Sequence, residues 1–191
     1  MKPLTSTTPH VIIMVGIPGS GKTTFAEHFA KTFQAPYINP GSIAEKIGLD
    51  ADATEKVTLL LFEELLKTNR TLVYEGSTFT KAQRSELTKH VAKAGYKTVT
   101  VWVQTEPYEA KRRATRKLNP LALSSDEYEN AVRRFENPTA AEKPVVISGK
   151  HTYTTQLKTV LKHLTRNAPE TQIPPAPQQP IVRPGRNIII R

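Results

Sequence analysis

Residues 16–23 read GIPGSGKT and fit the phosphate-binding loop pattern G-x-x-x-x-G-K-[ST] at every fixed position. The apolar, β-branched run Val11–Val15 precedes this segment and suits a buried parallel strand. Residues 24–33 follow it, and their apolar side chains recur at the spacing of a helix. A strand, a glycine-rich turn and a helix in this order are the setting that such a loop requires. The segment therefore predicts an α/β fold organised around a bound phosphate group.

The residue types in the loop match the demands of a triphosphate. Glycine allows the backbone to curl close to an anion, and the amides of residues 19–23 would point at it from a helix N-terminus. Lys22 suits the β- and γ-phosphates of ATP, the Thr23 hydroxyl suits Mg²⁺, and Thr24 could reach the α-phosphate. The residues predicted to bind the nucleotide are Gly16, Gly19, Ser20, Gly21, Lys22, Thr23 and Thr24.

Composition narrows the class of protein further. The chain has 191 residues and no cysteine, so it has neither a disulfide nor a cysteine-based metal site. Neither a signal peptide nor an apolar run of membrane-spanning length is visible, so we expect a soluble cytoplasmic protein without a membrane partner. The formal net charge of +10 favours a polyanionic partner such as nucleic acid or nucleotides, although solubility alone would explain it equally well.

Apolar strand-like runs alternate with helical patterns along most of the chain, which predicts a three-layer fold with a five-stranded parallel sheet. Beyond the first strand, strands are expected at residues 36–39, 71–75, 98–103 and 144–147. Helices are expected at residues 42–48, 52–69, 80–94, from 105 into a basic cluster at 111–117, at 124–135 and at 152–164. Capping residues are expected at Ser42, Asp52, Thr80 and Ser124.

These elements divide the chain into an N-terminal extension (1–9), one domain (10–166) and a C-terminal tail (167–191). Six prolines fall within the last 24 residues, so we expect the tail to be extended. Its end, Ile188–Ile190, has strong strand propensity and could add to a sheet edge of this chain or of a partner. An unstructured tail is the alternative.

A carboxylate and arginines complete the set that phosphoryl transfer needs. Glu75 ends the third expected strand and is predicted to serve Mg²⁺, with a solvated loop glutamate as the alternative. Arg112 and Arg116 are one helical turn apart and would close over the transferring phosphate as part of a lid, whereas Arg113 would point away. An exposed basic face is the alternative for this cluster. The five histidines lack metal-ligand spacing and are expected at the surface.

Several segments in this order resemble the polynucleotide-kinase-like P-loop proteins, which are often labelled AAA-family ATPases. The resemblance covers about residues 10–165 and rests on residues 16–24, 37–39, 75–84, 92–96, 111–116 and 135–142. It implies a kinase-type fold with a mobile helical lid, and a group that includes enzymes moving the ATP γ-phosphate to a 5′-hydroxyl of nucleic acid. Lys22 and Thr23 match the family's nucleotide-binding pair, and Arg112 and Arg116 match its lid arginines.

The chain departs from this family at two positions. Gly41 falls near an aspartate that usually accepts the hydroxyl proton, and Glu45, Asp50 or Glu75 could replace it. Glu75-Gly76-Ser77 stands where the family more often has Asp-x-Asn. The leading prediction is therefore an ATP- and Mg²⁺-dependent phosphotransferase acting on a hydroxyl of a nucleic acid or nucleotide. The alternatives are a small-molecule kinase of the zeta-toxin or antibiotic-phosphorylating type and a non-catalytic nucleotide-dependent binding module.

Overall fold

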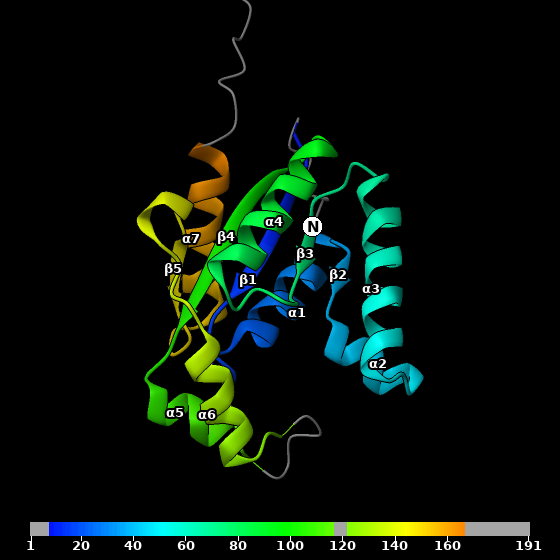
Figure 1. Cartoon of the computed structure of the whole chain (residues 1–191). Helices are drawn as coiled ribbons and strands as arrows, with labels where there is room; N and C mark the ends of the chain where they lie inside the picture. The colour runs from blue at the N-terminus through cyan, green and yellow to red at the C-terminus, as the bar shows by residue number, and fades with distance from the viewer. Residues whose placement is uncertain (1–7, 117–121, 167–191) are drawn as a thin grey trace, which may run out of the picture.

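A five-stranded parallel sheet forms the centre of the computed structural model, which describes residues 8–116 and 122–166 (Figure 1). The strand order is β2-β3-β1-β4-β5, so β1 with its phosphate loop is the central strand. Ile12 of β1 pairs with Val73 of β3 on one side and Val99 of β4 on the other. The strands are β1 (His10–Val15), β2 (Tyr37–Ile38), β3 (Leu72–Tyr74), β4 (Lys97–Gln104) and β5 (Val145–Ser148). The predicted fold class is confirmed.

Helices cover both faces of the sheet, and two helical pairs, α2 with α3 and α5 with α6, extend beyond the edge where β1 ends (Figure 1). Side chains of α1 and α7 pack on one face, and side chains of α3 and α4 pack on the other. The helices are α1 (Lys22–Phe33), α2 (Pro40–Ile47), α3 (Ala51–Leu66), α4 (Lys81–Lys93), α5 (Pro107–Ala114), α6 (Ser125–Arg134) and α7 (Tyr153–Arg166), with a 3-10 turn at Ala140–Glu142.

The alternation of side chains along β1 produces the two halves of the core. Ile12 and Met14 join Phe25 and Phe29 of α1 on one face, whereas Ile13 joins the cluster on the other. All six residues of β1 are buried, as expected for the central strand of a parallel sheet. His10, expected at the surface, is the first of them, and burial lowers its pKa. The phosphate loop is therefore anchored to the most buried strand.

Two of the predicted helix caps are confirmed and two are wrong. Thr80 and Ser124 each form the capping box that the sequence predicts. The α3 cap is Asp50, whose side chain accepts from the amide of Ala53, because the helix begins earlier than Asp52. The α2 cap is Asn39 rather than Ser42, because Pro40 takes the first helical position.

None of the helices that the structure describes has both the length and the apolarity needed to cross a bilayer. The predicted tail at 167–191 lies outside the described residues. Its docking to a sheet edge therefore stays a prediction.

Candidate phosphate-binding site

The loop between β1 and α1 has a backbone that only glycine adopts readily. Gly19 and Gly21 have φ angles of +74° and +105°, in the region that side chains disfavour. A Cβ added to Gly19 would lie 2.1 Å from the carbonyl oxygen of Ala110 in α5. α1 begins at Lys22, and no side chain caps its first amides. Those amides are therefore available to an anion.

The loop forms one wall of a cavity of about 810 Å³. Of the predicted nucleotide-binding residues, this cavity is lined by Gly19, Gly21, Lys22, Thr23 and Thr24. Gly16 and Ser20 are not among its lining residues. Ser20 is buried behind the loop, and a Cβ on Gly16 would lie 2.6 Å from the carbonyl oxygen of Val103. These two positions let the loop pack against β4 rather than face the cavity.

Lys22 is the cationic group on the loop wall. Its Nζ donates a hydrogen bond of 2.9 Å to the carbonyl oxygen of Ile17 within the loop. Burial lowers the pKa of Lys22, and the Glu75 carboxylate opposes this change only in part. An anion beside the amine would stabilise its charged form, so the geometry favours a phosphate group here.

Glu75 follows β3 and is held in place from two elements. Its Oε1 accepts a 2.8 Å hydrogen bond from Thr23 Oγ1, and its Oε2 accepts a 2.6 Å hydrogen bond from the Tyr37 hydroxyl. Asn39 donates to the Tyr37 oxygen at 2.9 Å. Burial, followed by the nearby Glu75 charge, raises the pKa of Tyr37 well above its usual range, so Tyr37 stays a donor. The structure thus joins Thr23 and Glu75, the two predicted metal ligands.

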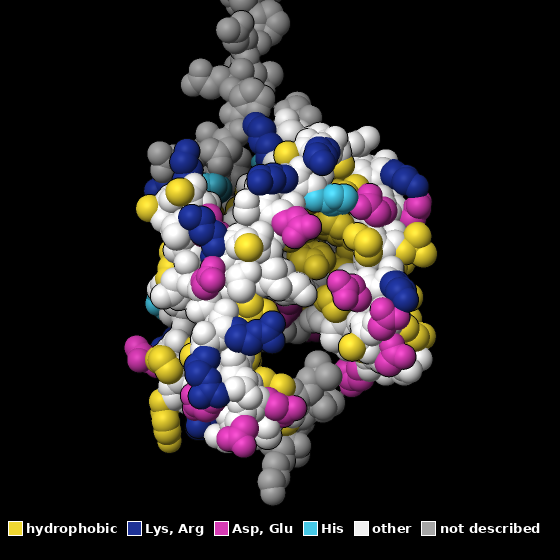
Figure 2. All heavy atoms as spheres, viewed as in Figure 1, with side chains coloured by type: hydrophobic (Ala, Val, Ile, Leu, Met, Phe, Trp, Pro, Cys, Tyr) yellow, Lys and Arg dark blue, Asp and Glu magenta, His cyan; other side chains and the backbone are white. Residues whose placement is uncertain are grey.

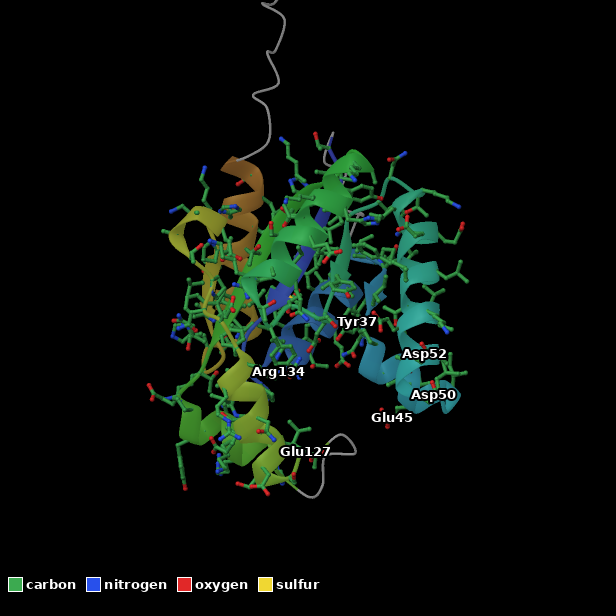
Figure 3. The ribbon with its side chains drawn as sticks, viewed as in Figure 1. Tyr37, Glu45, Asp50, Asp52, Glu127 and Arg134 are labelled. Carbon is green, nitrogen blue, oxygen red and sulfur yellow. The ribbon has the colours of Figure 1, made fainter. Side chains whose placement is uncertain are left out.

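The three carboxylates considered as a general base lie in different places. Glu75 lines the cavity beside the loop, as does Gly41, which has no titratable side chain. Asp50 lines a neighbouring cavity, and Glu45 lines neither. Figure 3 shows Glu45 and Asp50 together at the corner between α2 and α3, away from Tyr37. Of these three carboxylates, only Glu75 lines the cavity of the phosphate loop.

The arginines of α5 are not arranged as the sequence analysis predicted. α5 ends at Ala114, so the helical spacing that paired Arg112 with Arg116 does not continue to Arg116. Arg112 is 67% exposed and pairs with Glu109 at 2.8 Å. Arg113 instead lines the cavity and donates to the carbonyl oxygen of Gly149 at 3.2 Å. The interpretation that Arg113 points away is wrong, and the lid roles of Arg112 and Arg116 stay predictions.

The turn between β5 and α7 supplies a wall of the cavity that the sequence reasoning missed. Gly149, His151 and Tyr153 line it, and the His28 ring of α1 lies 5.2 Å from the Tyr153 ring. A Cβ on Gly149 would lie 2.0 Å from the Ser20 carbonyl oxygen, so this turn packs directly on the loop. The sequence feature that could have revealed this wall is a glycine directly after a strand. The rings give this wall flat apolar surface.

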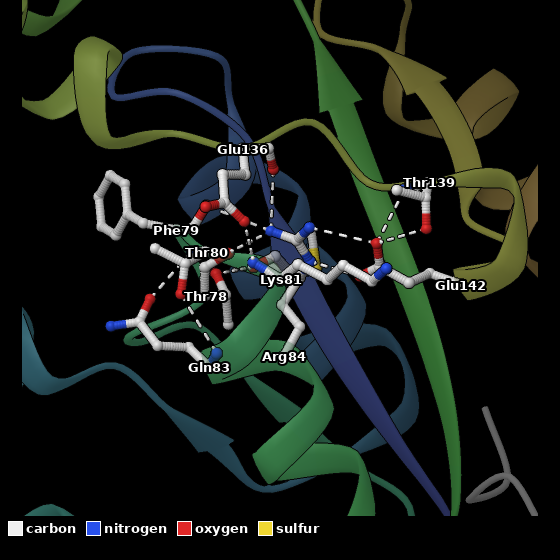
Figure 4. Close-up of polar contacts among 10 residues, drawn as sticks. Thr78, Phe79, Thr80, Lys81, Gln83, Arg84, Glu136, Thr139 and Glu142 are labelled. Atoms are coloured by element: carbon white, nitrogen blue, oxygen red, sulfur yellow. Dashed lines mark hydrogen bonds and ion pairs between the residues drawn. The ribbon is translucent and has the colours of Figure 1, made fainter.

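A buried arginine fixes the segment that carries Glu75. Arg84 of α4 is 2% exposed, and its Nε and Nη2 donate to the two oxygens of Glu142 at 2.6 and 3.2 Å (Figure 4). Its Nη1 donates to the carbonyl oxygens of Thr78 and Glu136, both at 3.0 Å. The hydrogen bonds from Arg84 hold the pKa of Glu142 below its usual range. One guanidinium thereby joins the strand end after β3 to the chain after α6.

Residues 11–138 match the family model described as an AAA domain. The chain belongs to this family. The matched AAA domain contains the loop, Glu75 and α5, whereas β5 and α7 follow it in the chain. No curated protein sequence matches the chain significantly.

Solved structures confirm a P-loop kinase-like fold for this AAA domain. A gluconokinase from Sinorhizobium meliloti 1021 superposes with a TM-score of 0.61 at 20% identity, covering 84% of this chain and 94% of that one. Kti12 from Chaetomium thermophilum, in complex with ADP-AlF3, has a TM-score of 0.63 at 18% identity, covering 83% and 99%. The Pnkp1/Rnl/Hen1 RNA repair complex has a TM-score of 0.57 at 20% identity, covering 66% and 44%. At these identities the likeness establishes the fold alone.

Proposed function

We propose that the protein is a phosphotransferase that moves the γ-phosphate of ATP to a hydroxyl group of a second substrate. The observation that carries this proposal is the joining of Thr23 to Glu75 across the same cavity that Lys22 and the helix amides line. The AAA-domain family and the kinase-like fold support nucleotide binding. The pairing of a loop hydroxyl with a strand-end carboxylate supports the finer step, transfer of the phosphate.

Each residue of the proposed site has a distinct role. The amides of residues 19–23 would bind the β- and γ-phosphates, and Lys22 would balance their charge. Arg113, which lines the same cavity from α5, would stabilise charge on the transferring group. Tyr37 and Asn39 would position Glu75 through their hydrogen bonds.

The oxygen atoms of Thr23 and Glu75 fit Mg²⁺, which usually takes one or two protein oxygens together with phosphate and water. Within the described residues, no group of three or more His, Cys, Asp and Glu side chains gathers as a metal site. The proposed metal therefore depends on this pair and on ATP itself. When bound, Mg²⁺ would neutralise charge on the phosphate oxygens.

In the proposed reaction the acceptor oxygen forms a bond to the γ-phosphorus, and the bond from that phosphorus to the β–γ bridging oxygen breaks. ADP leaves, and the hydroxyl proton passes to a carboxylate or to water. Because the transition state is loose, the protein contributes mainly positioning and charge stabilisation, so a strong base is not required. This accommodates glycine at position 41.

Two acceptor classes have support. The net charge of +10 and the fold shared with the RNA repair complex favour nucleic acid or a nucleotide. A second cavity beside the loop cavity, with no Lys or Arg in its lining, favours a small molecule. We place the small-molecule acceptor first, because a nucleic acid would need cations along its path.

Incubation with γ-³²P-ATP tests the proposed reaction. Label should pass to one of three panels: 5′-hydroxyl oligonucleotides, nucleosides or small hydroxyl compounds. Chelation of Mg²⁺ with EDTA should stop transfer, and Glu75→Gln should slow it by about 100-fold. ATP binding without transfer to any panel would instead support the non-catalytic binding module.

Arg112 and Arg113 are adjacent in α5 and provide a matched pair of variants that tests which arginine acts on the transferring phosphate. We expect Arg113→Ala to slow transfer by about 10-fold, because a cavity cation is lost. Arg112→Ala should change the rate by less than about 2-fold, because Arg112 is exposed and Glu109 would still form its ion pair with Arg113. Equal effects in single-turnover assays would contradict the placement of Arg113. Arg116→Ala, measured alongside, tests the role predicted from the sequence.

A further inference from the structure

A second cavity of about 730 Å³ lies between α2, α3, β3 and α4. Its lining shares Pro40, Gly41 and Ser77 with the cavity of the phosphate loop. A molecule held in it could therefore direct a group past Gly41 toward the transferring phosphate. This adjacency makes the second cavity the place where an acceptor would bind if the proposed function holds.

The second cavity is lined by several carboxylates and by no Lys or Arg, whereas Lys22 and Arg113 line the loop cavity. Asp50, Glu55 and Glu86 line the second cavity, and none of them forms an ion pair within the described part of the chain. His90, which also lines it, pairs with Glu63 at 2.6 Å, so its charge when protonated is already balanced. The cavity thus carries an excess of negative charge. Asp50 lies at the corner between α2 and α3, as Figure 3 shows.

Apolar and aromatic side chains form the floor. Phe62 is 3% exposed, and its ring lies 5.1 Å from the ring of Tyr74. Leu59 and Leu87 complete this surface. Figure 2 shows a hollow between α3 and α4 with hydrophobic side chains inside and acidic side chains at its rim. Aromatic faces beneath carboxylates attract organic cations.

One polar group in the wall lacks a partner. Thr58 of α3 is 6% exposed and lines the cavity, and its hydroxyl has no hydrogen-bond partner among the described residues. Buried hydroxyl groups are normally hydrogen-bonded, so the unpartnered Thr58 hydroxyl in this wall is a group that a ligand atom would satisfy after rotation of the side chain. This observation is independent of the carboxylates.

We propose that the second cavity binds the phosphoryl acceptor and selects a small organic cation, with an apolar or aromatic body and a free hydroxyl. That the bound molecule is the phosphoryl acceptor rests on the proposed function. That it is a cation rests on the side chains of the cavity itself. Phosphate-bearing acceptors are repelled by Asp50, Glu55 and Glu86. The positive net charge of the whole chain therefore does not describe the charge of this cavity, which is negative.

Three probes of matched shape test the selection: 2-phenylglycinol as the cation, 1-phenylethane-1,2-diol as the neutral form and mandelate as the anion. Binding is followed by NMR of ¹³C-methyl-labelled full-length protein, through the signals of Leu59 and Leu87. We expect the cation to bind at least about 5-fold more tightly than the neutral diol and mandelate to bind least. The variant Glu55→Gln/Glu86→Gln should lose that preference, whereas the exposed control Glu64→Gln on α3 should keep it.

Mandelate binding as tightly as the cation, no shift of these methyl signals by any probe, or an unchanged preference in the double variant would each overturn the proposal. ATP titrated into the same protein labelled with ¹⁵N, and followed at the amide signals of residues 19–23, tests the proposed function separately from this inference. ATP binding without cation selection defeats this inference alone. Cation selection without ATP binding defeats the proposed function and leaves the cation site standing.

Discussion

Lys22→Ala is expected to weaken ATP binding by about 100-fold and to leave the fold intact. Lys22 provides the cationic side chain on the loop wall, and hydrogen bonds from a charged group to phosphate contribute about 1.5–3 kcal/mol. Because burial lowers the pKa of Lys22, its charged form is disfavoured in the folded protein, so removing the amine costs little stability at neutral pH. Titration with a fluorescent ATP analogue measures the loss.

Lys31→Ala is the matched control, since Lys31 is an exposed lysine on the same helix, outside the cavity. It should bind the analogue as the wild type does. If both variants bind equally, the loop lysine does not contact the nucleotide. Circular dichroism melts of both variants show whether a loss of affinity reflects unfolding.

Arg84→Met is expected to destabilise the protein by about 3–5 kcal/mol, because it leaves the Glu142 carboxylate and several carbonyl oxygens without their donor. For a chain of this size the melting temperature should fall by about 6–20 °C. The cause is the loss of one partner from a buried pair rather than the loss of packing volume. Thermal and urea unfolding measure the change.

Lys89→Met is the control on the same helix, at an exposed position that forms no ion pair within the described residues, and should change stability by less than about 0.5 kcal/mol. Glu142→Gln combined with Arg84→Met should cost less than the sum of the two single changes, since both remove one interaction. An Arg84→Met protein as stable as the Lys89→Met control would mean that the buried network contributes nothing net.

Local patterns were sufficient for most of the fold. The strand Val11–Val15, the glycine loop and the first helix are contiguous, so their geometry follows from residues that touch. The capping boxes at Thr80 and Ser124 are equally local. Helix ends were harder. Both Asp50 and Asp52 can cap a helix, and only the packing of α3 selects Asp50.

Predicting the site required knowledge of contacts between distant segments, and the spacing of residues along the sequence does not reveal such contacts. Glu75 was found because strand ends converge at one edge of a parallel sheet. Its partner Tyr37 is brought close by the pairing of β2 with β3. The cavity positions of Arg113 and Gly149 depend on how α5 and the β5–α7 turn pack on the loop. The second cavity is built from four elements, α2, α3, β3 and α4, and no single stretch of sequence encodes its negative charge.

Calorimetric titration of the folded wild-type chain with ATP and Mg²⁺ tests the central claim most directly, because it asks whether the β1–α1 loop holds a triphosphate. We predict saturable binding at one site per chain, weakened about 100-fold by Lys22→Ala and unchanged by Lys31→Ala. Absence of saturable binding to folded protein, or binding that survives Lys22→Ala unchanged, would contradict it.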